Sequence, residues 1–311
     1  MTTIKPLNVA LALAATFLSS STVLSAEMTE QNIKNSYLEH AAKAQFYRWY
    51  QYYERSEGGL DNAIDILSSD VFIKSTLGEA TGTEAYRARV AQLPTTWKNA
   101  HFVKNIATNV ETDGSVSLNA QITYLNEGAN EDGSVRAADL NYTTKLAPSD
   151  ALLPKFSSIE IALDKPSDIT EYSDAYAMNR ALSVVHYWLA IIEDPARNPE
   201  PAKEILADGF SLNFSSGAIT DFQGLEAWLT GPAASVSASS HSLKNFSAKS
   251  TNDQEITLTV GFDWQGILPD GTRLEAETLH NWTLTNDVTE RFARIKSVDV
   301  EIIKPFQPVG K

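Results

Sequence analysis

The spacing of apolar residues changes from helical to strand-like once in each half of the chain. The helical stripes consist of Phe46, Trp49, Tyr50 and Tyr53 in the first half and of Leu182, Val185, Leu189 and Ile192 in the second. Apolar and polar residues then alternate over 116–124 and over 256–264, which is typical of strands with one buried face. Helices followed by strands predict an α+β domain in each half, with helices packed on one face of an antiparallel sheet.

Shorter elements are predicted around these segments. The residues Asn-Pro-Glu at 198–200 favour a helix start, because Asn caps free N–H groups and Pro fits the first turn. Short helices are also predicted over 83–93 and 225–230. The Asp-Gly pairs at 132–133 and 270–271 predict hairpin turns between alternating strands.

The two halves share short motifs in the same order, which indicates that one fold is present twice. The segments 101–105 and 241–245 both follow the pattern H-x-[VL]-K-N. The other matches pair Trp49 with Trp188, 70–72 with 208–210, 82–86 with 224–228, 141–143 with 281–283, and 158–161 with 297–300. All pairs lie roughly 140 residues apart, so the copies differ by small loop insertions. We predict domains at 27–165 and 174–305, joined by a polar linker that contains Pro166.

The N-terminus has the features of a secretory signal peptide over 1–26. Lys5 precedes an apolar stretch over 7–18, and small residues lead to a predicted cleavage after Ala26. The alternative is an N-terminal membrane anchor, for which the apolar stretch is short. The chain has no cysteine, so it has neither a lipoprotein attachment site nor disulfides. We therefore expect a periplasmic or secreted protein that is not inserted in a membrane once the signal is removed.

The charge balance limits the partners. Lys and Arg number 25 against 39 Asp and Glu, for a formal net charge of −14. This acidity argues against nucleic acid and against anionic membrane surfaces. A neutral, apolar or cationic small ligand is compatible with it, although the charge also serves simply to keep an exported protein soluble.

Several of the matched motifs support a resemblance to a known family. They are the Trp49 and Trp188 helices, Asp70-x-Phe72 and Asp208-x-Phe210, the turns at Gly82 and Gly224, and the two H-x-[VL]-K-N segments. Each half resembles a nuclear transport factor two-like domain, the fold that includes SnoaL-like polyketide cyclases, dehydratases and isomerases. The resemblance implies two cone-shaped domains, each with about three helices on a curved antiparallel sheet. It also implies that the tandem domains pair through their sheets as an intramolecular pseudo-dimer, with the outer sheet faces covered.

The resemblance further implies that His, Asp or Tyr side chains in the cone carry any proton transfer. The candidate catalytic residues are His241, Asp208, His101 and Asp70, with His280 and Asp263 as further ionisable groups of the second half. The alternative is that the histidines begin a strand and the aspartates cap turns. The candidate ligand-binding residues are Trp49, Tyr53, Trp97, His186, Trp188 and Trp282, and their alternative role is core packing.

Motifs for other chemistries are missing from the sequence. It has no phosphate-binding glycine loop, no dinucleotide fingerprint, no His-Glu-x-x-His and no Gly-x-Ser-x-Gly. We therefore expect neither a metal nor a cofactor. The sequence leaves open whether the protein is an enzyme. The first hypothesis is an exported, non-catalytic module that binds an apolar small molecule or a protein partner. The second is a cofactor-independent isomerase, dehydratase or cyclase that uses His/Asp acid–base chemistry.

Overall fold

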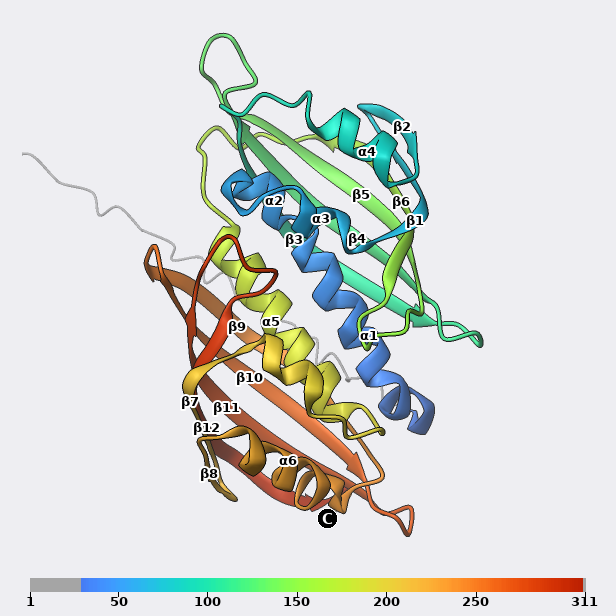
Figure 1. Ribbon diagram of the computed structural model, residues 1–311, viewed down its shortest axis with the longest axis vertical. Helices are drawn as coiled ribbons and strands as arrows, with labels where there is room; N and C mark the ends of the chain where they lie inside the picture. The colour runs from blue at the N-terminus through green and yellow to red at the C-terminus, as the bar shows by residue number, and fades with distance from the viewer. Residues whose placement is uncertain (1–28, 310–311) are drawn as a thin grey trace, which may run out of the picture.

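The computed structural model describes residues 29–309, so the predicted signal peptide lies outside the described part of the chain. Within that part, two domains follow one another, each built from a six-stranded sheet and its helices (Figure 1). No helix in it is both long enough and apolar enough to span a membrane.

Both domains have the same order of strands and the same sheet topology. The first consists of α1 (Glu30–Arg48), α2 (Gln51–Glu54), α3 (Asp61–Ile64), β1 (Leu67–Ser75), β2 (Gly78–Thr81), α4 (Thr83–Val90), β3 (Lys98–Val110), β4 (Val116–Glu127), β5 (Arg136–Ala147) and β6 (Lys155–Pro166). The second consists of α5 (Tyr176–Glu193), β7 (Leu206–Phe214), β8 (Gly217–Ile219), α6 (Phe222–Thr230), β9 (Ala238–Asn252), β10 (Glu255–Ile267), β11 (Arg273–Thr285) and β12 (Arg294–Pro308). The strand orders are β2-β1-β6-β5-β4-β3 and β8-β7-β12-β11-β10-β9, so β3 and β9 are edge strands.

The predicted α+β architecture is confirmed, with two differences in detail. The sheets are mixed, because β1 pairs parallel to β6 and β7 pairs parallel to β12. The helix expected after 198–200 is a short 3₁₀ turn over Glu200–Glu204, and the chain then enters β7 directly. Asp70 and Asp208 therefore lie within strands instead of capping a helix end.

The repeated H-x-[VL]-K-N motif lies inside the edge strands and coincides with a bulge in each. In β3 the ladder skips from Val103 to Asn105, and in β9 it is interrupted after Lys244. Asn245 has a φ of 52°, a left-handed conformation that Asn tolerates better than most residues. The Lys-Asn part of the motif therefore forms the bulge at which each edge strand bends.

The two domains are joined through their long helices, whereas the resemblance implied pairing through the sheets. Helices α1 and α5 run antiparallel, side by side, between the two sheets (Figure 1). Small residues at the contact allow this approach: Ala41, Ala44 and Ala181 are fully buried. The Ser183 hydroxyl donates to the Ala44 carbonyl across the helix pair at 2.9 Å.

Each long helix also begins against the other domain. Ile33, in the first turn of α1, is buried against Ala238 and Ile267 of the second domain. Ala175, just before α5, is buried against Ala100 and Leu125 of the first domain. This exchange places helical side chains from each half beside the edge strand of the other half.

The outer sheet faces are polar. In β4 the inward residues Val116, Leu118 and Ile122 are buried, whereas Asn119 and Gln121, which point outward, are exposed. A polar face needs no cover, which is the physical reason that the sheets are not the contact between the domains.

Candidate functional site

A buried glutamate holds the histidine of the repeated motif in the first domain. Glu54, at the end of α2, accepts hydrogen bonds through Oε1 from the backbone N–H of His101 at 2.9 Å and from its Nδ1 at 3.2 Å. Asn179 of α5 donates to the same oxygen at 2.9 Å. Burial raises the pKa of Glu54, and the hydrogen bond from His101 opposes that rise. Because the carboxylate accepts from Nδ1–H, Nε2 of neutral His101 carries the free lone pair.

The second domain repeats this pair. Glu193, at the end of α5, accepts from the backbone N–H of His241 at 2.8 Å and from its Nδ1 at 2.7 Å. Burial raises the pKa of Glu193 too, and the hydrogen bond from His241 opposes that rise. The sequence contains a signal for both glutamates, because Trp49-x4-Glu54 matches Trp188-x4-Glu193. This shared spacing is inconspicuous because the four residues between Trp and Glu differ in the two copies.

The structure does not bring the candidate aspartates to the histidines. Asp70 and Asp208 are exposed on β1 and β7, and Asp263 is exposed on β10, where it pairs with Lys244 at 2.6 Å. The expected His/Asp pairs are replaced by His101–Glu54 and His241–Glu193. The glutamates reach the histidines because the helices that carry them run along the inner side of each sheet's edge.

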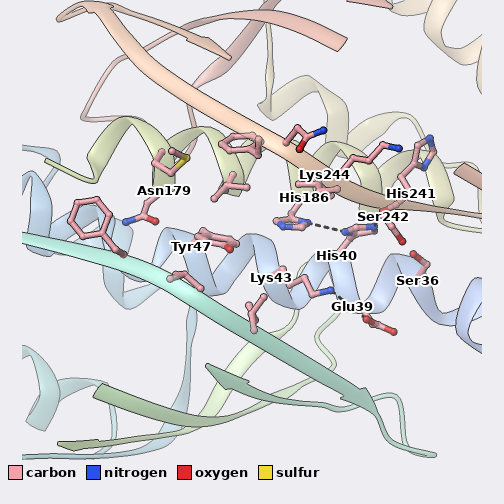
Figure 2. A pocket seen from close by; sticks show the side chains of 18 of the residues that line it. Ser36, Glu39, His40, Lys43, Tyr47, Asn179, His186, His241, Ser242 and Lys244 are labelled. Atoms are coloured by element: carbon pink, nitrogen blue, oxygen red, sulfur yellow. Dashed lines mark hydrogen bonds and ion pairs between the residues drawn. The ribbon is translucent and has the colours of Figure 1, made fainter. Parts of the chain in front are cut away.

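A cleft of about 560 Å³ separates the edge strands β3 and β9 and is floored by α1 and α5 (Figure 2). In it, Nδ1 of His40 lies 2.8 Å from Nδ1 of His186. Nε2 of His40 donates to the carbonyl of His241 at 3.2 Å. A neutral imidazole has a single N–H, so Nδ1 of His40 accepts a hydrogen bond from Nδ1–H of His186. Burial lowers the pKa of both rings well below its ordinary value. His186, a candidate ligand-binding residue, thus belongs to the contact between the domains.

The first domain encloses a second cavity, the cone, of about 410 Å³. Its walls include the candidate ligand-binding residues Trp49, Tyr53 and Trp97, together with His101 and Tyr124. The imidazole of His101 lies beside both tyrosines, with ring centroids 6.1 Å and 5.2 Å apart. Among residues 29–309, Nε2 of His101 has no hydrogen-bond partner. The predicted aromatic wall and one predicted histidine therefore meet in one cavity.

Hydrogen bonds hold the aromatic wall of the cone in place. The hydroxyls of Tyr53 and Tyr86 bond to each other, and the Tyr124 hydroxyl donates to Asn99 at 2.8 Å. Trp49 packs on Tyr53 with ring centroids 5.5 Å apart. A wall whose side chains are fixed in this way is already formed before a ligand arrives.

In the second domain the corresponding inner positions hold larger side chains. Trp264, which stands where the first domain has Tyr124, leans along β10 so closely over Gly266 that a Cβ there would lie 2.3 Å from its ring. Phe306 of β12 packs edge-on against that ring at 4.8 Å. His280 is buried beside Phe262 and Trp282, and burial lowers its pKa to about 3. The remaining candidates Trp188 and Trp282 are buried in the core of this domain.

The described residues contain no cluster of three or more His, Cys, Asp or Glu side chains able to hold a metal ion. The cone's own residues offer apolar and aromatic surface for a ligand, two arginine side chains and an imidazole, that of His101, which can exchange a proton. Glu54 would hold the imidazole in one orientation and stabilise its protonated form.

No protein-family model matches the chain, and no curated protein matches it in sequence. Each of the following solved structures matches about the length of one domain. A hexachlorocyclohexane dehydrochlorinase of Novosphingobium barchaimii is 10% identical over 43% of this chain and 88% of its own, with a TM-score of 0.36. An uncharacterised protein with a cystatin-like fold from Caulobacter vibrioides is 14% identical over 42% and 91%, with a TM-score of 0.35. ActVI-ORFA from Streptomyces coelicolor is 14% identical over 39% and 96%, with a TM-score of 0.32.

These likenesses concern the fold alone. Both domains of the chain have the same six-stranded sheet topology, so the chain contains one α+β fold twice in tandem, as the repeated motifs predict.

Proposed function

We propose that the protein binds a small, largely apolar ligand in the cone of its first domain. The observation that carries the proposal is the 410 Å³ cavity with Trp49, Tyr53 and Trp97 in its walls. Its volume falls within the roughly 300–1,000 Å³ of small-molecule sites, and aromatic walls with a few polar groups are typical of them. The second domain contributes α5, whose Asn179 supports Glu54 and hence the edge of the cone.

We also propose that the protein acts after export, in the periplasm or outside the cell. Only the sequence of 1–26 and the lack of cysteine support this part. Mass spectrometry of the mature protein from a periplasmic extract tests it, with cleavage near Ala26 as the expected result. A full-length cytoplasmic protein would contradict it.

The binding proposal is tested by filling the cone. Leu140 is a half-buried residue of β5 in the cavity wall, and a Leu140→Trp substitution would occupy its space. Asn119→Trp, on the exposed outer face of β4, is the matched control. Ligands would come from a thermal-shift screen of hydrophobic metabolites, since a ligand that binds only the folded state raises the Tm. We expect Leu140→Trp to abolish the shift and Asn119→Trp to keep it. Equal shifts in both variants would place binding elsewhere.

The His101–Glu54 pair favours a second candidate function, cofactor-independent acid–base catalysis in the same cone. In this role Nε2 of His101 takes a proton from a bound substrate and returns it to another atom or to a leaving group, while Glu54 holds Nδ1. Elimination and isomerisation both follow this scheme, and neither needs an oxidant or a reductant.

The duplicated pair supplies the control for this second candidate. We expect His101→Gln to lower turnover of a bound compound at least ~100-fold, the usual contribution of a general base, whereas His241→Gln leaves it within about twofold. NMR of the bound compound in deuterated water would reveal proton exchange even without net conversion. Binding without any exchange or conversion would leave the binding role as the function and rule out the catalytic one.

A further inference from the structure

The cone carries a positive charge that the composition of the protein does not explain. Two arginines, Arg89 of α4 and Arg136 of β5, line it, and none of the lining residues within 29–309 is acidic. Acidic residues outnumber basic ones by 39 to 25 in the whole chain. The charged residues that line this cavity are all basic, although the chain as a whole is acidic.

Neither arginine has a carboxylate partner within the described residues. Arg89 donates through Nη1 to the carbonyl of Gly78 at 2.8 Å, and its guanidinium lies 5.7 Å from the centre of the Tyr86 ring. Arg136 donates through Nη2 to Oδ1 of Asn130 at 3.3 Å. Each guanidinium has five N–H donors, so both keep donors and a full charge for a further acceptor.

Both charges act on groups inside the cone. Burial raises the pKa of the Tyr53 hydroxyl to about 12, and Arg89 is one of the groups that oppose the rise. Burial also raises the pKa of Tyr124, and Arg136 opposes it together with the hydrogen-bonding Asn126. The arginine charges are thus felt at two hydroxyls on different walls of the cavity.

We propose that the cone selects aromatic carboxylates: the rings lie against Trp49, Tyr53 and Trp97, and the carboxylate faces Arg89 and Arg136. This inference rests on the proposed binding function and names its ligand class. The net acidity of the chain predicts a neutral, apolar or cationic ligand. The local positive charge of the cavity instead favours an anionic ligand. A guanidinium binds a carboxylate through two parallel hydrogen bonds, which a neutral amide cannot reproduce.

Isothermal titration of matched pairs tests the inference. The probes are aryl carboxylates of one to three rings, each compared with its primary amide. We expect the mature protein to bind the best carboxylate at least about tenfold more tightly than its amide, the effect of one charged hydrogen bond. Arg89→Gln with Arg136→Gln should remove this preference. Arg87→Gln is the matched control, because Arg87 is also on α4 but pairs with Asp61 outside the cone.

The outcomes separate the inference from the function on which it rests. Equal affinity for carboxylate and amide, both abolished by Leu140→Trp, would overturn the inference and leave the binding function intact. A carboxylate preference that survives in the double arginine variant would overturn the inference as well. Binding of neither compound would overturn the inference, and a thermal-shift screen without any ligand would overturn the binding function as well. A preference lost only in the double variant, and weakened by added salt, supports the inference.

Discussion

At the scale of single residues, the duplicated glutamate does more than orient a histidine. Oε1 of Glu54 accepts three N–H groups, two from His101 of its own domain and one from Asn179 of the other domain. Its side chain is completely buried. Removing it would leave these donors unsatisfied in a site that water does not reach.

We therefore expect Glu54→Ala to lower the free energy of unfolding by at least about 3 kcal/mol, because three buried N–H donors lose their acceptor at about 1–3 kcal/mol each. Glu54→Gln keeps an acceptor oxygen and should cost about 1–2 kcal/mol. Asp70→Ala, at an exposed carboxylate, should stay within about 0.5 kcal/mol of the wild type. Urea denaturation followed by tryptophan fluorescence measures all three. A Glu54→Ala variant as stable as Asp70→Ala would show that the buried pair adds nothing to the fold.

At the scale of elements, the contact between the domains depends on small residues where α1 and α5 meet. Ala44 has no exposed surface, and its carbonyl accepts the Ser183 hydroxyl from the facing helix. Interiors are packed at the density of organic crystals, so an added side chain has no free space there. A larger residue would push the helices apart and break the hydrogen bond.

Substitution of Ala44 by Leu should therefore destabilise the protein by about 1–3 kcal/mol, the usual cost of overpacking. Ala88→Leu, at an exposed position of α4, adds the same side chain without a packing conflict and should change stability by less than about 0.5 kcal/mol. Thermal unfolding of the two variants gives the comparison. Similar Tm values would show that α1 and α5 accommodate the larger side chain without loss of stability.

The sequence predicts the strands better than it predicts their assembly. Alternation over 116–124 and 256–264 locates β4 and β10, because a half-buried strand requires a period of two. The crossing of α1 against α5 depends on Ala44 and Ser183 fitting at one point, and periodicity within a helix does not report its partner. The aromatic wall of the cone is visible in Trp49, Tyr53 and Trp97. In the second domain, Trp264 leans over Gly266, which is a packing detail that no spacing encodes.

At the scale of the whole molecule, the two halves are related by approximate twofold symmetry, and the contact between them departs from it where His40 meets His186. Asn179 of α5 donates to the carbonyl of His101, and His40 of α1 donates to the carbonyl of His241. The partner of His40 is His186, which occupies the position equivalent to Tyr47 in α1. One half of the contact thus has two buried imidazoles at positions where the other half has Asn179 and Tyr47.

Protonation of the two rings works against the fold. His40 already donates from Nε2, so a proton on its Nδ1 would face the N–H of His186 at 2.8 Å. Lys43 and the ring of His241 add positive charge nearby, whereas Glu193, 3.6 Å from His40, favours the charged form. Burial dominates and lowers the pKa of both rings in the folded state. The unfolded chain therefore binds more protons below its ordinary histidine pKa of about 6.5, and stability falls as the pH falls through that value.

We expect the free energy of unfolding to decrease from about pH 6.5 downward, with each of the two histidines contributing up to about 1.4 kcal/mol per pH unit. The raised pKa values of Glu54 and Glu193 act in the opposite sense and are common to every variant compared. The substitutions His40→Asn and His186→Tyr copy the residues of the symmetry-related half and remove both groups. Urea denaturation of the double variant between pH 5 and 8 should give a shallower dependence of stability on pH. An unchanged slope would show that these rings do not couple protonation to folding.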